Sequence, residues 1–160
     1  MADRSMLPLS YDEESQRRFM FEALAESQQA LPACHPNPPV GCVIVHGQTI
    51  VARGFTGAPG MPHAEAAALL NLGEVDDPGE LAVFVTLEPC AFVGRTPSCA
   101  RALVMSGIRK VYVGTLDPDP RNNGAGIDIM RRAGIDVRVG VLEAHVLAFI
   151  APYLASAQHP

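Results

Sequence analysis

The sequence has few of the features that mark membrane, secreted or nucleic-acid-binding proteins. No apolar run reaches the roughly 18 residues that a membrane span needs, and residues 1–10 lack the apolar core of a signal peptide. Only 12 lysines and arginines stand against 17 acidic residues, for a formal net charge of −5. This balance disfavours a nucleic-acid partner, which needs a basic surface, although Arg101, Arg109 and Lys110 are close enough in sequence to form a local basic patch. We therefore expect a cytoplasmic protein with no membrane contact.

Cysteine is also scarce, with four residues in the chain. In a reducing compartment such cysteines are more often metal ligands or buried core residues than disulfides. Cys42 falls inside a predicted strand and is interpreted as a small core residue. Cys34 stands beside His35 in a loop, where two side chains are too few to close a metal site. Both cysteines are therefore interpreted as structural, which leaves Cys90 and Cys99 for chemistry.

Length and composition predict one compact domain. A chain of 160 residues with 48% hydrophobic residues can build a real core, and no repeat or low-complexity tract interrupts it. We expect residues 1–9 to form a flexible tail and residues 10–160 to form a single domain.

Hydrophobic patterns and turn residues predict alternating helices and strands. The first helix is expected to begin after Ser10 as N-cap, with Glu13 completing a capping box. Strands separated by helices imply parallel crossovers, after an opening antiparallel hairpin. The sequence thus predicts an α/β fold, a three-layer α-β-α sandwich with a mixed five-stranded sheet. Its helices are predicted over residues 11–30, 63–72, 97–106, 127–133 and 141–157, and its strands over residues 40–45, 49–55, 81–87, 108–115 and 135–139.

Four polar residues stand at the boundaries of these elements in the pattern of a hydrolytic zinc site. His63 and Glu65 begin a predicted helix, Cys90 follows a strand through a proline, and Cys99 lies early in the next helix. One His and two Cys can hold zinc and leave its fourth position for water, whose pKa zinc lowers toward about 7. The glutamate can then move protons. His-x-Glu followed by Pro-Cys and a further Cys is the pattern of zinc nucleobase deaminases.

Simpler interpretations exist for each residue taken alone. His63 can be a surface histidine, and Glu65 an acid that balances a helix dipole. Cys90 and Cys99 can be separate buried thiols or a redox disulfide. Together, however, all four stand at element boundaries in the deaminase order, and helix starts favour thiolates. We therefore favour the joint zinc site.

Several stretches of the chain resemble the cytidine-deaminase-like superfamily, and most closely the deaminase domain of the riboflavin-pathway pyrimidine deaminase. The resemblance covers residues 19–143. Eight residues separate Cys90 from Cys99, whereas nucleoside and transfer-RNA deaminases resemble Pro-Cys-x-x-Cys. The longer spacing therefore favours the riboflavin-type branch. The matching stretches are PNPPVGCVIV at residues 36–45, PHAE at 62–65, TLEPC at 86–90, GRTPSC at 94–99 and DPDP at 117–120.

The resemblance implies a role for each matching residue. His63, Cys90 and Cys99 would hold one Zn²⁺ per chain, and Glu65 would carry protons. Asn37 would hydrogen-bond the substrate, since an amide both donates and accepts, or would instead make an Asx turn before the next proline.

Four further residues are candidates for substrate contact. The backbone N–H groups near Ala64 would support the reacting centre, and Phe92 offers an apolar face for a ring. Arg95 would meet an anionic group, or is a solvated loop arginine. Asp117 would border the site, or merely caps its loop.

Three departures from the riboflavin-type pattern concern the substrate. Thr56 and Phe92 stand where that family usually has histidines, and Asp119 stands where it usually has asparagine. These changes weaken the expected contacts to a phosphoribosyl group. We also expect no reductase domain, which is often fused in that family, because the sequence ends at residue 160.

We expect a hydrolytic deaminase of an amino-substituted nitrogen heterocycle, most like the riboflavin-pathway diaminopyrimidine deaminase. Alternatives are a deaminase of another small base, nucleoside or related metabolite with a cytosine- or guanine-like ring, a transfer-RNA-editing deaminase, or a non-catalytic zinc module. Related deaminases pack as homodimers or homotetramers, and the apolar last helix fits such an assembly, although the same face can instead cover its own sheet.

Overall fold

The computed structural model describes residues 10–92 and 98–154. Its centre is a five-stranded sheet with strand order β2-β1-β3-β4-β5. The strands are β1 (Gly41–His46), β2 (Thr49–Phe55), β3 (Leu81–Leu87), β4 (Lys110–Thr115) and β5 (Asp136–Val139), and the helices are α1 (Glu13–Gln29), α2 (Ala64–Leu72), α3 (Cys99–Ser106), α4 (Ala125–Arg132) and α5 (Glu143–Leu154), with a short 3₁₀ helix at Pro78–Glu80.

The pairing of the strands is mixed. Strand β1 pairs antiparallel with both β2 and β3, whereas β3 with β4 and β4 with β5 are parallel. This confirms the predicted opening hairpin and the parallel crossovers. All residues of β3 and β4 are buried, as expected for parallel strands that are covered on both faces.

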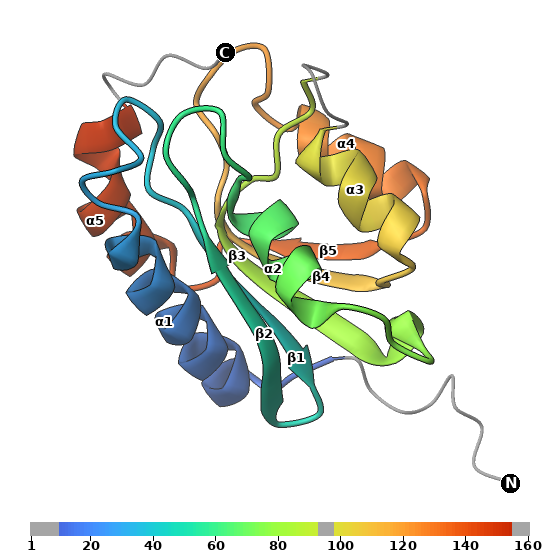
Figure 1. The fold of residues 1–160 in the computed structure, drawn as a ribbon. Coiled ribbons are helices and arrows are strands. Elements are labelled where there is room, and N and C mark those ends of the chain that lie inside the picture. Colours follow the sequence, from blue (N-terminus) through green and yellow to red (C-terminus); the bar gives the residue numbers. More distant parts are fainter. Residues whose placement is uncertain (1–9, 93–97, 155–160) are drawn as a thin grey trace, which may run out of the picture.

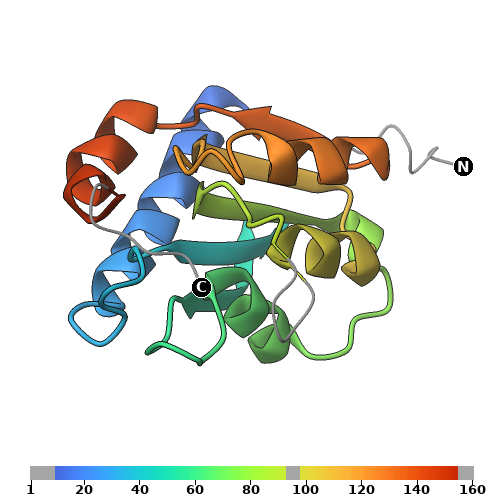
Figure 2. The same cartoon turned by 90° about the horizontal axis from the view of Figure 1, so that it is seen from above.

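Helices cover both faces of the sheet, which confirms the predicted three-layer sandwich. Helices α1 and α5 lie on one face, and α2, α3 and α4 lie on the other (Figures 1 and 2). On the α1 face, the rings of Phe84 and Tyr112 stack with centroids 4.4 Å apart, and the ring of Phe19 packs against Phe84. These aromatic side chains, all nearly inaccessible to solvent, join α1 to the two central strands.

The start of the first helix differs from the prediction. Asp12, not Ser10, is the N-cap, and its Oδ1 atom accepts a hydrogen bond of 2.8 Å from the Ser15 N–H. A carboxylate at this position also complements the positive end of the helix dipole. The predicted capping box of Ser10 and Glu13 is therefore wrong, because the helix begins three residues after Ser10.

Other boundaries shift by one or two residues within the described chain. Helix α3 begins at Cys99 with Ser98 as its N-cap, rather than at residue 97, which lies outside the described residues. Helix α4 begins two residues earlier than predicted and β4 two residues later. The sequence patterns do not predict the short 3₁₀ helix. The expected flexible tail over residues 1–9, and the end of the predicted last helix at residues 155–157, lie outside the described residues, and a single domain over residues 10–160 stays a prediction.

Candidate active site

Two helix starts and one strand end meet at one place on the sheet (Figure 1). His63 is the N-cap of α2 in an extended conformation, and its side chain makes no capping hydrogen bond, so the imidazole is available for other partners. Cys99 is the first residue of α3, and Cys90 follows the end of β3. Because helix starts present unpaired N–H groups and a positive dipole end, this place favours anionic sulfur.

The three expected ligands come together. The Nδ1 atom of His63 lies 3.5 Å from the Sγ atom of Cys99 and 3.9 Å from the Sγ atom of Cys90. One donor atom from each of these residues lies within 4.8 Å of the others. A tetrahedral zinc ion with bonds of about 2.0–2.3 Å places its nitrogen and sulfur ligands ~3.5 Å apart. The donor set and its spacing therefore fit zinc.

The two thiols of the site differ in their protonation. The Cys99 thiol hydrogen-bonds Cys90, which lowers the pKa of Cys90 to about 4, with further support from His63 and from the Cys99 N–H at 3.3 Å. That same bond, together with burial, raises the pKa of Cys99 well above its usual range, and the bond to Cys90 also raises the pKa of His63. The hydrogen bond therefore favours the thiolate of Cys90 over that of Cys99, and metal binding would displace the remaining proton from Cys99.

Glu65 is buried beside these ligands in the first turn of α2, with 4% of its surface exposed. Burial, and secondly the negative charge of Cys90, raise the pKa of Glu65 to about 7. A carboxyl group that titrates near neutral pH can both accept and release a proton during turnover. Its environment suits proton transfer rather than a surface ion pair.

The site opens into a cavity of about 40 Å³ lined by Glu65, His63 and Cys90, together with Asn37, Pro38, Val40, Thr56, Leu87, Glu88 and Asp117. A water molecule occupies about 30 Å³ of the liquid, so this volume suits an ion or a water at the base of a site. Strand ends and two loops form its walls, and both hydrogen-bonding and apolar side chains line it.

The sequence-predicted substrate residues take different places. Asn37 and Asp117 line the cavity, and the buried Ala64 begins α2, so its N–H is among those with no acceptor within the helix. The Arg121 guanidinium lies over the ring of Phe92, 4.6 Å from its centroid. Arg95 lies outside the described residues. The contact of each with substrate stays a prediction.

The remaining cysteines behave as expected. All four cysteines are free of disulfide bonds, so Cys90 and Cys99 do not form the redox disulfide that was one interpretation of the pair. Cys34 and Cys42 are fully buried, which agrees with their structural interpretation.

Two buried polar residues beside the site were missed by sequence reasoning. Glu88 lines the cavity, and its carboxylate accepts hydrogen bonds from four backbone N–H groups. Asn122 is completely buried and accepts a 2.9 Å bond from the Ala91 N–H. The signal for Glu88 was its place immediately before Pro89-Cys90, where a charged residue follows a mostly apolar strand. Asn122 stands in a polar loop and carries no such signal.

Comparison with known proteins agrees with this geometry. Residues 13–115 match the family described as the cytidine and deoxycytidylate deaminase zinc-binding region. The riboflavin biosynthesis protein RibD of Aquifex aeolicus is 45% identical over 130 residues, which are 81% of this chain and 36% of that protein. The chain thus spans about a third of the length of this curated relative.

Solved structures give the same result. The RibD structure from Acinetobacter baumannii has a TM-score of 0.82 and 38% identity, covering 89% of this chain and 40% of that one. A diaminohydroxyphosphoribosylaminopyrimidine deaminase/5-amino-6-(5-phosphoribosylamino)uracil reductase from Thermotoga maritima has a TM-score of 0.83 and 36% identity, covering 91% and 42%. The predicted superfamily and the resemblance to its riboflavin-type members are confirmed. The chain belongs to the cytidine and deoxycytidylate deaminase family, whose zinc-binding region matches residues 13–115.

Proposed function

We propose that this chain is a zinc-dependent hydrolytic deaminase whose substrate is the diaminopyrimidine of riboflavin synthesis. The observation that carries the proposal is the convergence of His63, Cys90 and Cys99 within 4.8 Å, beside a buried glutamate whose pKa is raised to about 7. The names of its relatives, at 36–45% identity, support the choice of substrate.

His63 through Nδ1, with Cys90 and Cys99 as thiolates, would hold one zinc ion. Bound zinc would supply a Lewis acid and lower the pKa of a water molecule at its open position. The α2 and α3 helix starts keep these ligands in place. Because Cys90 has a pKa of about 4, only one further thiol proton must leave for the ligand set to be complete.

Glu65 would perform the proton transfers. Its carboxylate accepts a proton from the attacking water and delivers it to a ring nitrogen, and the water oxygen bonds to the carbon that carries the amino group. Glu65 then passes the second water proton to the amine, the C–N bond breaks, and ammonia leaves. The overall change is the exchange of an amino group for an oxygen with one water consumed. A group with a pKa near neutrality suits both directions of transfer.

The cavity walls would orient the ring. Asn37 offers both a donor and an acceptor to a heterocycle edge, and the Ala64 N–H points from the start of α2 as a donor for developing negative charge. Phe92 would supply an apolar face, Asp117 a part of the cavity wall, and Arg95 a cation for an anionic group. Each of these contacts is part of the proposal.

A second candidate substrate is an unphosphorylated ring, such as a cytosine- or guanine-like base. The Thr56 hydroxyl accepts a hydrogen bond from the Val40 N–H and donates one to the Val40 carbonyl oxygen, so the backbone already occupies it. Arg121 pairs with Asp119 through two nitrogen–oxygen contacts of 2.8 and 3.2 Å while it covers Phe92. Asp119 thus offers a carboxylate, already paired with Arg121, at a position where the riboflavin-type family usually has an asparagine. A carboxylate is a poorer partner for a phosphate than an amide, and this favours an unphosphorylated ring.

Ammonia release from a substrate panel tests the proposal. Purified protein with measured zinc is incubated with the phosphoribosyl diaminopyrimidine, its dephosphorylated form, and cytosine and guanine compounds. Release from the phosphoribosyl compound alone supports the main proposal, and release from an unphosphorylated ring supports the second candidate. No release from any ring by zinc-loaded protein would contradict both and favour a non-catalytic zinc module.

We also propose that the protein is cytoplasmic and binds neither a membrane nor a nucleic acid. None of the described helices has the length and apolar character that a membrane crossing requires. The acidic net charge disfavours a nucleic-acid substrate, and four free thiols suit a reducing cytoplasm.

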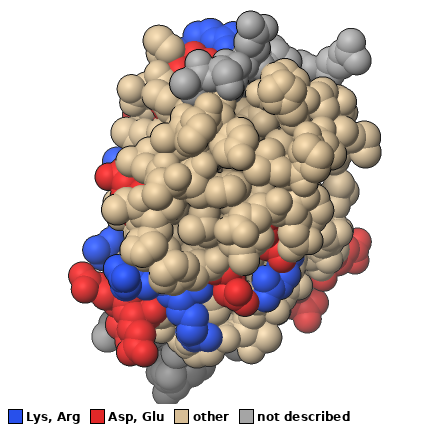
Figure 3. Space-filling model, turned by 90° about the vertical axis from the view of Figure 1, so that its left-hand side faces the viewer, with Lys and Arg blue, Asp and Glu red and all other residues tan. Residues whose placement is uncertain are grey.

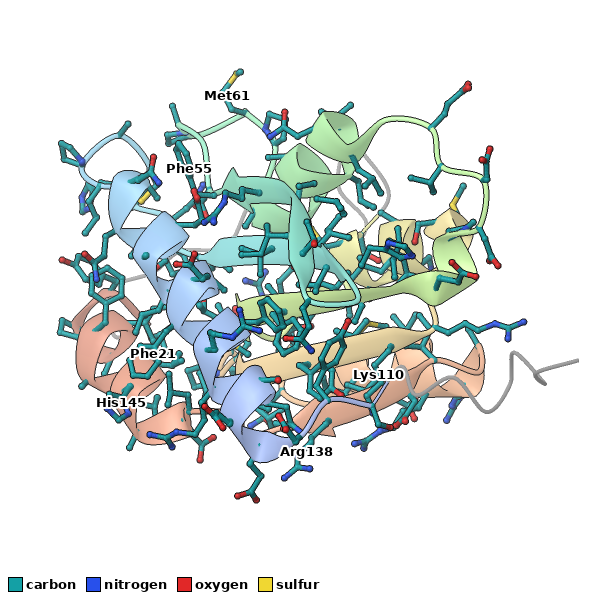
Figure 4. All side chains as sticks on the ribbon, turned by 90° about the horizontal axis from the view of Figure 1, so that it is seen from below. Phe21, Phe55, Met61, Lys110, Arg138 and His145 are labelled. Carbon is teal, nitrogen blue, oxygen red and sulfur yellow. The ribbon has the colours of Figure 1, made fainter. Side chains whose placement is uncertain are left out.

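A homodimer or homotetramer is supported by one broad face. Figure 3 shows that the middle of the visible described surface on the side of α1 and α5 carries almost no charged side chains, which lie instead along its lower and left edges and near its top. Phe21, Phe55 and Met61, all exposed, lie on this side with His145 (Figure 4), and Phe21 and His145 are in edge contact. Light scattering on the wild type and on Phe21→Ser would measure the assembly. A monomeric wild type would contradict the proposal.

A further inference from the structure

A buried carboxylate joins the metal-binding end of β3 to the loop between β4 and α4. Glu88 follows β3 directly, precedes Cys90 by two residues, and has 3% of its surface exposed. Its Oε1 atom accepts hydrogen bonds from the N–H groups of Asp117 at 3.1 Å and Gly124 at 3.0 Å, and its Oε2 atom from those of Gly126 at 3.0 Å and Ile127 at 3.3 Å. One side chain thus anchors both ends of this loop.

A second buried link connects the same two segments. The Oδ1 atom of Asn122 accepts from the Ala91 N–H at 2.9 Å, and its Nδ2 atom donates to the Oδ2 atom of Asp117 at 3.2 Å. The other oxygen of Asp117 accepts from the Asp119 N–H at 3.0 Å. The peptide that follows Cys90 is therefore held by Asn122, and Asn122 is oriented by the cavity-lining Asp117.

The backbone around these links is in close contact. A Cβ atom added to Gly126 would lie 1.9 Å from the carbonyl oxygen of Pro89, so the start of α4 touches the segment that carries Cys90. No side chain larger than a hydrogen fits between them. Any loosening of the loop would therefore move both a ligand segment and a cavity wall.

We propose that Glu88 is a positioning residue, which acts with Asn122 and Asp117 to set the place of Cys90 and of the cavity wall that Asp117 helps to form. Hydrogen bonds to an ionised acceptor are roughly twice as strong as neutral ones, and four of them converge on one buried carboxylate. Residues 116–124 belong to no helix or strand, so these bonds replace a regular backbone ladder. The activity part of the test rests on the proposed deaminase function.

Glu88→Gln is the informative variant. It keeps the shape of the side chain, but either orientation of the amide turns an NH₂ group toward two of the four backbone donors. We expect kcat/KM to fall roughly 10- to 100-fold, as for other residues that orient a metal site. KM should rise, because the cavity wall shifts, while zinc stays at one per chain. A fall in the folded fraction alone would lower kcat and leave KM unchanged.

Amide hydrogen exchange gives a readout that needs no substrate. In Glu88→Gln the amides of Asp117, Gly124, Gly126 and Ile127 should exchange at least about 10-fold faster, with the β1 and β2 amides unchanged. Glu26→Gln is the matched control, because Glu26 is also a buried carboxylate, paired with Arg53 and Gln29 away from the cavity. It should leave KM and these four exchange rates at wild-type values.

A donor–acceptor swap tests the second link. Asn122→Asp places two carboxylates in contact with each other and should raise KM in the same manner as Glu88→Gln. Adding Asp117→Asn restores an amide–carboxylate pair in the reverse order, and the new carboxylate at position 122 can still accept from the Ala91 N–H. In the double variant the exchange rates at Ala91 and Asp119 should return to within about 3-fold of the wild-type rates. This remaining difference should be smaller than the one that Asn122→Asp produces alone, because the two changes are coupled.

Unchanged exchange at the four amides in Glu88→Gln would overturn the proposal, as would kinetic constants equal to those of Glu26→Gln. Faster exchange over the whole chain would also overturn it, since that result means a general loss of stability. A wild-type protein inactive on every ring would refute the proposed function but not this inference, which the exchange data and the swap decide by themselves.

Discussion

The Nδ1 atom of His63 lies 3.5 Å from the Sγ atom of Cys99, although the two residues are 36 positions apart in the chain. This separation is close to the ~3.5 Å expected between nitrogen and sulfur ligands of one tetrahedral zinc ion. Each residue stands at the start of a helix, α2 or α3. The fold therefore brings the ligands together before metal binds, and the site needs little rearrangement to close around it.

Loss of one ligand should release the metal. Cys99→Ser removes a thiolate, and we expect bound zinc to fall from one per chain to a small fraction, because a hydroxyl is a poor zinc ligand. A zinc concentration 100-fold above Kd adds about 2.7 kcal/mol to the free energy of unfolding, so the variant should also melt at lower temperature. Metal analysis and calorimetry measure both effects. Cys34→Ala, which removes a buried thiol outside the site, should keep its zinc; a Cys99→Ser protein with full zinc would refute the assignment.

Removal of the proton-carrying group should separate binding from catalysis. Glu65→Gln preserves the shape of a buried side chain but cannot exchange protons, so kcat should fall by roughly 10²- to 10⁴-fold. Zinc content should stay at one per chain, because Glu65 is not among the three grouped ligands. Steady-state ammonia release with parallel metal analysis is the measurement. Turnover equal to wild type in a zinc-loaded Glu65→Gln protein would rule out this role.

The reactivity of Cys90 should show its depressed pKa. The Cys99 hydrogen bond lowers the pKa of Cys90 to about 4, so in metal-free protein its thiolate is already fully formed at pH 6. Burial acts in the opposite direction on Cys34 and Cys42 and raises the pKa of both. Because the thiolate is the nucleophile, iodoacetamide should alkylate Cys90 first, at a rate nearly constant from pH 6 to 8.

Mass spectrometry of peptides would follow this reaction, and bound zinc should protect Cys90. A rate that rises about tenfold per pH unit over this range would mean an ordinary thiol and contradict the assigned protonation state.

The contact between α4 and the ligand segment should tolerate no added atom. In Gly126→Ala the new Cβ would lie 1.9 Å from the Pro89 carbonyl oxygen, and backbone must move to relieve the clash, at a cost of roughly 1–3 kcal/mol. Gly140→Ala is the comparison, since Gly140 has φ +94° but open space around it, so that only backbone strain of about 1–2 kcal/mol applies.

Chemical denaturation gives the free energy of unfolding of both variants, and metal analysis shows which one disturbs the site. Gly126→Ala should also lower zinc affinity, whereas Gly140→Ala should not. Equal zinc affinity in the two proteins would show that the contact with Pro89 does not reach Cys90.

The errors of the sequence-based prediction have local physical causes. The capping-box pattern favours Ser10 as the N-cap, because a serine followed three residues later by glutamate satisfies it, yet Asp12 offers a charged acceptor nearer the helix start. The 3₁₀ helix at Pro78–Glu80 is too short to leave a hydrophobic period. The first error is a competition between two neighbouring capping residues, which the sequence pattern does not rank. The second arises because periodicity needs a longer segment than three residues.

The sequence by itself determined the alternation of helices and strands, the mixed sheet and the choice of His63, Cys90 and Cys99 as the candidate metal ligands. Apolar periodicity, turn residues and residue type are local properties, and they are sufficient for those conclusions. Only the tertiary structure decided that the Cys99 thiol hydrogen-bonds Cys90, that Glu65 is buried deeply enough to raise its pKa to about 7, and that Glu88 and Asn122 hold the loop beside Cys90. These properties depend on distances and desolvation between segments far apart in the chain, and no local pattern encodes them.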